Sequence, residues 1–244
     1  MALRIRCSPS RVGVIAAGLS RRPDTVWVDI LGGGNEISTA LFLKGTQSRN
    51  ALLLRDLPST ADVLSWDAYD LMRVFPASFS WNHGLLTTEQ SDAISQTSSD
   101  PAETCEIQQL DEALIDQLSI NARASYNTLA TNLNTSASTV RRRLELLQST
   151  NMIRLACEVD LALLGATTEA LLWIATGPAN LEAAGNTLSC HPNVRFTAST
   201  TGATNLLVAV AAQNLNDLYA FLTQTVGALN DIRSLEVTPI LSSV

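Results

Sequence analysis

Apolar and polar positions follow a recurring order near the C-terminus of the chain. Residues 170–175 form an apolar run of strand length, whereas Leu181, Ala184 and Leu188 recur at the spacing of a buried helix face. Pro192 ends that helix, because the residue before a proline avoids the helical region. The pattern predicts the order β-α-β-β-α-β. The expected strands are Ala170–Ala175, Val194–Thr200, Leu206–Ala211 and Ile232–Ile240, and a second helix is marked by Leu215, Leu218, Phe221 and Leu222.

The same order recurs near the N-terminus at a constant offset of 169 residues. Three turn-forming residues fall into register under this offset: Pro9 with Pro178, Pro23 with Pro192 and Gly33 with Gly202. Because such residues mark where elements begin and end, the match indicates an internal repeat. The expected elements of the first copy are Leu3–Cys7, Ser10–Ser20, Thr25–Leu31, Ile37–Lys44, Gln47–Leu57 and Val63–Val74.

This element order predicts an α+β fold with two ferredoxin-like domains, each of four antiparallel strands with two helices on one face. The other face of each sheet stays free and, if apolar, needs a partner. Trp27, Trp66 and Trp173 are candidates for that buried face, with ordinary core packing as the alternative. We expect the two free faces to pair with each other as a pseudo-dimer, or with another chain as a homo-oligomer.

Between the two copies lies a segment of different character. Residues 87–108 are mostly polar and predict a linker, and residues 109–165 predict a compact helical module. Leu110, Leu114 and Leu118 form one helical stripe, and Ser125 is a good N-cap for a second helix. We therefore expect a ferredoxin-like domain over residues 1–86, the linker over 87–108, a winged helix-turn-helix over 109–165 and a second ferredoxin-like domain over 166–244.

The third helix of this module carries the functional prediction. Ser136 caps it, and Val140, Leu144 and Leu147 are spaced to pack on the first two helices. Hydroxyl and guanidinium side chains then cover the outward surface, as a DNA recognition helix requires. The predicted DNA contacts are Ser136, Ser138, Thr139, Arg141, Arg142, Arg143 and, in a wing strand expected over Ile153–Val159, Arg154. The alternative is a solvated, merely basic helix face.

Composition sharpens this prediction. The net charge is −7 and the pI near 4.8, so only a local basic patch can bind nucleic acid. Lys44 is the single lysine beside many arginines, which indicates a GC-rich, bacterial source. Four cysteines lack metal-ligand spacing and suit reduced thiols in the cytoplasm. We expect no metal, no cofactor and no membrane span, since no apolar run approaches about 18 residues.

The helix-turn-helix resembles the Lrp/AsnC family of transcriptional regulators. Residues 136–143, SASTVRRR, are similar to the family pattern S-x-x-T-V-x-R-R, and 110–130 resemble its first two helices. Residues 170–240 resemble the family's effector domain, called RAM, with Thr201-Gly202 present but Asn205 in place of an acid. The resemblance implies a regulator that binds double-stranded DNA and a small effector such as an amino acid. The implied effector residues are Thr201, Gly202, Asn205 and, in the first copy, Gly33, Gly34 and Glu36.

One departure is that no helix-turn-helix precedes the first copy, because Leu3 already begins its first strand. The chain is then either part of a tandem protein or has a single reading head. Two other functions compete with the regulator. A sirohaem-decarboxylase-like enzyme would need cavity histidines, but His83 and His191 are the two available and no nucleophile–base pair is in view. A sensor or assembly module without DNA binding is the second.

Overall fold

The computed structural model describes residues 1–75, 81–87, 89–90, 106–150, 152–153 and 159–244. The chain divides into two compact units. Met1–Leu85 and Asp160–Val244 together form what we call the sheet unit, and Leu86–Val159 form the helical unit. Within the described ranges, no helix is both long enough and apolar enough to cross a membrane.

The N-terminal half of the sheet unit, residues 1–85, follows the predicted order. Its central strand β1 lies antiparallel between β3 and β4, and β2 pairs with β3. Leu3, Ile5 and Cys7 alternate along β1 toward the helices, and they form a core with Ala16 and Leu19. The elements are β1 (Ala2–Cys7), η1 (Pro9–Arg11), α1 (Val12–Ser20), β2 (Thr25–Leu31), β3 (Glu36–Leu41), α2 (Gly45–Ala51), η2 (Leu52–Asp56), α3 (Leu57–Ser59) and β4 (Val63–Tyr69).

The C-terminal half, residues 160–244, repeats this arrangement. Strand β6 lies antiparallel between β8 and β9, and β7 pairs with β8. Every residue of β8 is buried, which explains its uninterrupted apolar sequence. The elements are η4 (Leu161–Leu164), β6 (Thr168–Thr176), α8 (Leu181–Ser189), β7 (Val194–Thr200), β8 (Leu206–Ala212), α9 (Leu215–Ala220), η5 (Phe221–Val226) and β9 (Ile232–Ser243).

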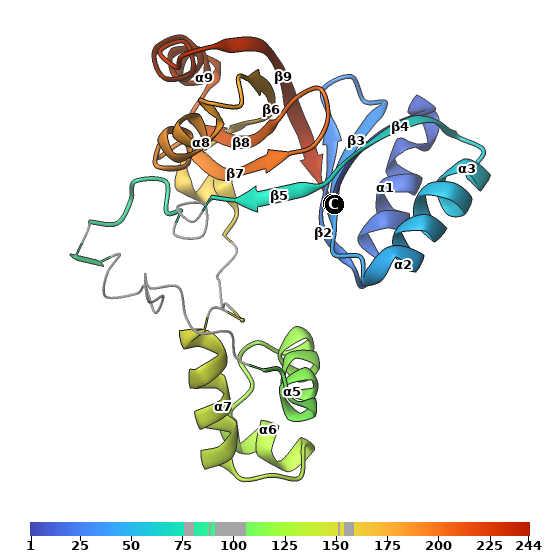
Figure 1. The fold of residues 1–244 in the computed structure, drawn as a ribbon, viewed down its shortest axis with the longest axis vertical. Coiled ribbons are helices and arrows are strands. Elements are labelled where there is room, and N and C mark those ends of the chain that lie inside the picture. Colours follow the sequence, from blue (N-terminus) through green and yellow to red (C-terminus); the bar gives the residue numbers. More distant parts are fainter. Residues whose placement is uncertain (76–80, 88, 91–105, 151, 154–158) are drawn as a thin grey trace. The chain divides into compact units, whose positions relative to one another are not determined.

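The last strand of each half crosses into the other half. The predicted single strand Val63–Val74 is wrong, because the chain breaks at Asp70 and continues as β5 (Leu71–Val74), which pairs with β7 (Figure 1). Strand β9 extends beyond its predicted end and pairs with β2 through Ile240, Ser242 and Ser243. The resulting strand order is β4-β1-β3-β2-β9-β6-β8-β7-β5. Each crossing strand covers an edge that would otherwise be open for pairing.

The two halves also share an apolar layer. Ala2 and Leu31 of the N-terminal half pack with Leu171, Trp173 and Leu207 of the C-terminal half. Two aromatic contacts cross this layer, Trp27 with Phe196 and Tyr69 with Trp173, each with ring centroids 5.1 Å apart. Trp66 instead packs against the core of its own half.

The helical unit contains three described helices around a small core. They are α5 (Gln109–Ile120), α6 (Tyr126–Asn132) and α7 (Ala137–Ser149). Leu114, Leu129, Val140 and Leu144 are buried between them. The linker predicted for 87–108 lies largely outside the described residues.

Candidate functional site

The candidate nucleic-acid interface is the outward face of α7 in the helical unit. The Ser136 hydroxyl accepts a hydrogen bond of 3.1 Å from the backbone N–H of Thr139 and so fixes the start of the helix. Asn134 takes a φ of 50° in the turn between α6 and α7, a conformation that asparagine tolerates well. The sequence thus produces a tight turn followed by a capped helix, as predicted.

The buried anchors of α7 are Val140, Leu144 and Leu147, as their spacing predicts. Ser136, Ser138, Arg141 and Arg142 are exposed, and Thr139 is half-buried. The helix therefore presents one apolar face to the unit and one hydroxyl- and arginine-bearing face to solvent.

Arg143 does not lie on that exposed face, so the expectation that its guanidinium points outward beside Arg141 and Arg142 is wrong. Its residue is 9% exposed, and its Nε donates to Oδ1 of Asp111 over 2.7 Å while Nη2 donates to Oδ2. Asp111 is fully buried at the start of α5, and its carboxylate also accepts the backbone N–H of Gln108. These hydrogen bonds, with that of Arg143 the largest cause, lower the pKa of Asp111. The pair joins α5 to α7.

The physical reason is the position of Arg143 on the helix. It follows Val140 by three residues and precedes Leu144, so it borders the apolar stripe rather than the solvent face. The missed indication was Asp111, which stands three residues before buried Leu114 and shares its face.

The two outward arginines differ in their surroundings. Arg141 Nε donates to Glu145 over 2.7 Å, one helical turn along, and this hydrogen bond raises the pKa of Arg141. Among the described residues Arg142 makes no ion pair. Two further exposed residues, which the sequence did not single out, are Arg123 in the turn before α6 and Tyr126 at the start of α6. Arg154 and most of the predicted wing lie outside the described residues.

The predicted effector residues of the C-terminal half lie at a turn that the N-terminal half covers. The backbone N–H of Thr201 donates to Asp70 O over 3.0 Å, and its hydroxyl accepts the N–H of Asp70 over 2.9 Å. Gly202 has a φ of +105°, and the Tyr69 ring lies against it. Asn205 is bonded through both ends of its amide to the backbone of Thr176. An effector reaching these groups must therefore displace contacts within the chain.

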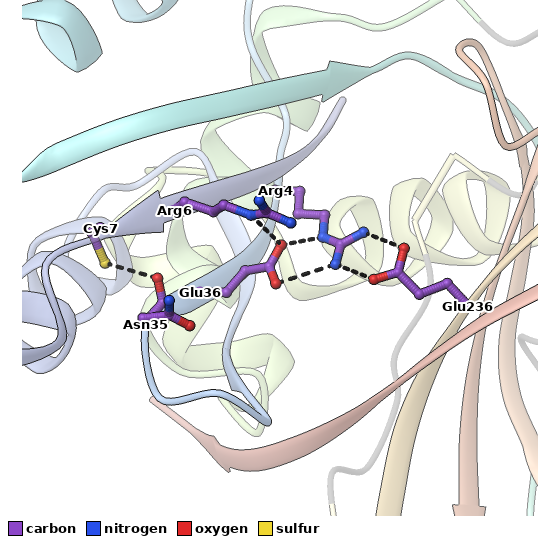
Figure 2. A network of polar contacts seen from close by, with 6 residues as sticks. All are labelled: Arg4, Arg6, Cys7, Asn35, Glu36 and Glu236. Carbon is purple, nitrogen blue, oxygen red and sulfur yellow. Dashed lines mark hydrogen bonds and ion pairs between the residues drawn. The ribbon is translucent and has the colours of Figure 1, made fainter.

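The predicted effector residues of the N-terminal half are likewise engaged. Gly34 has a φ of +66° and serves the turn, and Gly33 lies beside the Asn35 side chain. Glu36 is largely buried and accepts hydrogen bonds from Arg4 (Figure 2).

Arg4 links the two halves in this network. Its Nη1 donates to Glu236 of β9 over 2.8 Å and its Nη2 donates to Glu36 of β3 over 3.2 Å (Figure 2). The guanidinium carbon also lies 5.3 Å from the centre of the Trp173 ring, within cation–π range. The hydrogen bond from Arg4 is the largest cause that lowers the pKa of Glu236.

The histidines show no catalytic arrangement in the part of the chain described here. The Nδ1 atom of His191 accepts the backbone N–H of Asn193, its ring lies 4.8 Å from that of Phe221, and burial lowers its pKa. The His83 ring lies beside Trp81. Over the same residues, no three or more His, Cys, Asp or Glu side chains are placed to hold a metal ion.

Comparison with known proteins agrees with this geometry. Residues 108–148 match the AsnC-type helix-turn-helix domain, and residues 169–244 match the Lrp/AsnC ligand binding domain. An uncharacterized HTH-type transcriptional regulator of Pyrococcus horikoshii is 28% identical over 140 residues, which are 57% of this chain and 88% of that protein. An uncharacterized HTH-type transcriptional regulator of Pyrococcus abyssi is 29% identical over 140 residues, with the same coverage of both chains.

The solved structure of E. coli AsnC covers 57% of this chain and 94% of its own, with a TM-score of 0.50 and 23% sequence identity, so it supports the fold. The α+β prediction is thus confirmed for a helix-turn-helix followed by a ferredoxin-like ligand-binding domain. The prediction of a regulator rather than an enzyme is confirmed as well, because the family and the relatives are transcriptional regulators. Over residues 108–148 and 169–244 the chain therefore carries both domains of the Lrp/AsnC family of helix-turn-helix transcriptional regulators.

Proposed function

We propose that the helical unit binds double-stranded DNA through the exposed face of α7. The observation that carries this is the separation of roles among three adjacent arginines. Arg143 fastens α7 to α5, which leaves Arg141 and Arg142 directed outward beside Ser136, Ser138 and Thr139. Arginine suits both phosphate and guanine contacts, and short hydroxyls suit the phosphate backbone. Arg154 remains a candidate contact at the backbone.

We further propose that residues 1–86 are a second ferredoxin-like effector domain. The winged helix-turn-helix domain then spans residues 109–165, and the effector domain that matches the ligand binding family spans residues 166–244. Its support is the shared strand order and the constant offset. The two domains then act as a dimer built into one chain, which carries one reading head per pair of sheets. A small effector such as an amino acid would act near Thr201, Gly202, Asn205, Gly33, Gly34 and Glu36, in a cytoplasmic, bacterial setting.

The DNA proposal is tested by the variant Arg141→Ala with Arg142→Ala, measured on the DNA upstream of the protein's own gene. We expect weaker binding and a salt dependence whose slope falls by about one for each lost phosphate contact. The matched control is Arg55→Ala with Arg233→Ala, two exposed arginines of the sheet unit. Unchanged binding by the α7 variant, with an unchanged melting curve, would show that Arg141 and Arg142 do not contact the DNA. A natural chain that binds no DNA in this assay would favour the sensor or assembly role.

A further inference from the structure

The two halves of the sheet unit meet each other at equivalent positions, but with unlike residues. Under the offset of 169, Asp70 corresponds to Pro239 and Gly32 corresponds to Thr201. The corner at Asp70 rests on the turn at Thr201, and the corner at Pro239 rests on the turn at Gly32. Each contact contains the equivalent backbone hydrogen bond. Thr201 N donates to Asp70 O over 3.0 Å, and Gly32 N donates to Pro239 O over 2.8 Å.

The backbone nitrogen of each corner residue fits only the side chain of the turn on which that corner rests. Asp70 has a backbone N–H, and the Thr201 hydroxyl accepts it over 2.9 Å. Pro239 has no N–H, and Gly32 has no hydroxyl. A Cβ at position 32 would lie 3.1 Å from Pro239 Cδ, so a threonine there would crowd the proline ring. Pairing two N-terminal halves would place Asp70 on Gly32 and leave its N–H without an acceptor.

A second contact discriminates by volume. Phe75, which follows β5, is fully buried in the core of the C-terminal half and lies directly over Gly185 of α8. A Cβ at position 185 would lie 1.9 Å from the Phe75 ring. The equivalent residue of the N-terminal half is Ala16, which carries that Cβ. Phe75 therefore fits the helix of the unlike half and not the helix of its own.

The third contact discriminates by charge. Arg4 corresponds to Trp173 under the offset, and the two side chains contact each other across the layer. Pairing of two N-terminal halves would bring one Arg4 against another, which replaces a cation–π contact by repulsion between like charges.

We propose that these three contacts form a recognition surface by which the N-terminal half selects the unlike half and rejects a second copy of itself. The partner that this surface fits is a half of the opposite kind, which the same chain supplies. The inference concerns pairing of the sheets and does not depend on DNA binding.

The test uses four full-length chains of identical composition. They are the natural chain, a turn swap (Gly32→Thr with Thr201→Gly), a corner swap (Asp70→Pro with Pro239→Asp), and the combination of both swaps. The corner swap also removes the ion pair between Asp70 and Arg49. Each chain is therefore repeated with Arg49→Ala, so that this loss is common to all. The melting temperature of the sheet unit is the readout.

We expect each single swap to lower the melting temperature by about 4–8 °C, because it leaves one N–H unpaired and crowds one proline. The combined swap should recover most of this loss, because the introduced proline again rests on a glycine and the introduced aspartate again meets a threonine hydroxyl. If single swaps fail to fold, recovery of a cooperative transition by the combined swap still supports the proposal. A combined swap that melts below both single swaps, or that fails to fold, overturns it.

Discussion

The helical unit and the sheet unit each bury one arginine against carboxylates, and the two arrangements differ in how much water reaches them. Arg143 and Asp111 face each other, with 11% and 0% of their side chains exposed. Arg4 is shared between Glu36 and Glu236, and the Glu236 side chain is 53% exposed. Water cannot replace either member of the Arg143–Asp111 pair, whereas water can solvate the Glu236 carboxylate if Arg4 is lost. The comparison teaches that the surroundings of an arginine, not its neighbours in sequence, decide whether it can reach DNA.

The largest effect is expected for Arg143→Ala. Removing the guanidinium leaves the Asp111 carboxylate buried without its partner, which costs about 3–5 kcal/mol. We expect the helical unit to unfold and DNA binding to disappear with it, as measured by thermal melting and gel shift. Arg142→Ala is the matched control and should leave the melting curve unchanged.

A second variant distinguishes the buried charge from general disruption. Asp111→Leu with Arg143→Met removes both charges and keeps apolar volume between α5 and α7, so most of the stability should return. A helical unit that melts normally with Arg143→Ala alone would contradict the role given to this pair.

A smaller effect is expected for Arg4→Met in the sheet unit. Glu36 loses its hydrogen-bonded partner and keeps only the longer ion pair with Arg6 Nε at 4.0 Å, and water can solvate the exposed Glu236, so the free energy of unfolding should fall by about 1–3 kcal/mol. Denaturant titration of the full chain measures it. Arg6→Met, whose side chain is 63% exposed, serves as control and should change the same quantity by less than about 0.5 kcal/mol. Equal losses from both variants would remove the distinction between Arg4 and its neighbour.

The smallest effect concerns pH. Burial raises the pKa of Asp29, while the largest cause acting on Asp111 lowers its pKa. As pH falls, the unfolded chain protonates Asp111 before the folded chain does, so the helical unit loses stability as pH falls through the folded pKa. For Asp29 the folded chain protonates first, so acid relieves the cost of its burial.

Asp29→Asn removes that cost at neutral pH. We expect a rise of about 1–2 °C in the melting temperature of the sheet unit at pH 7, and the difference from the natural chain should vanish as pH falls toward the ordinary aspartate pKa of about 3.9. Melting curves between pH 7 and pH 4 check this. A difference that grows on acidification would show that Asp29 is stabilised by its charge.

Local patterns predicted much of the fold because most elements depend on local residues. The strand Thr25–Leu31 was predicted with its observed bounds, and the caps at Ser125 and Ser136 mark helix starts. The break at Asp70 was not predicted, because it depends on Thr201, which is distant in sequence and supplies the hydrogen bonds that hold the corner. Periodicity carries no information about which edge a strand will pair with.

The candidate site was predictable to the same degree. The stripe of Val140, Leu144 and Leu147 correctly placed one face of α7 inward. It could not place Arg143, whose burial requires a carboxylate contributed by another helix. Whether a charged residue at the margin of an apolar stripe is buried or exposed depends on its ion-pair partner. That partner can be identified only once the packing of the helices is known.

The insertion of Phe75 beneath α8 imposes an order on biosynthesis. A ribosome adds about 5–20 residues per second, so the 110 residues between Phe75 and Gly185 take roughly 6–22 s to emerge. During that interval the C-terminal core that buries the Phe75 ring has not yet been synthesised. The edge of β2 likewise lacks residues 240–243, with which it pairs. Until then the nascent N-terminal half exposes an aromatic ring and an unpaired strand edge, and such an edge can pair with another chain.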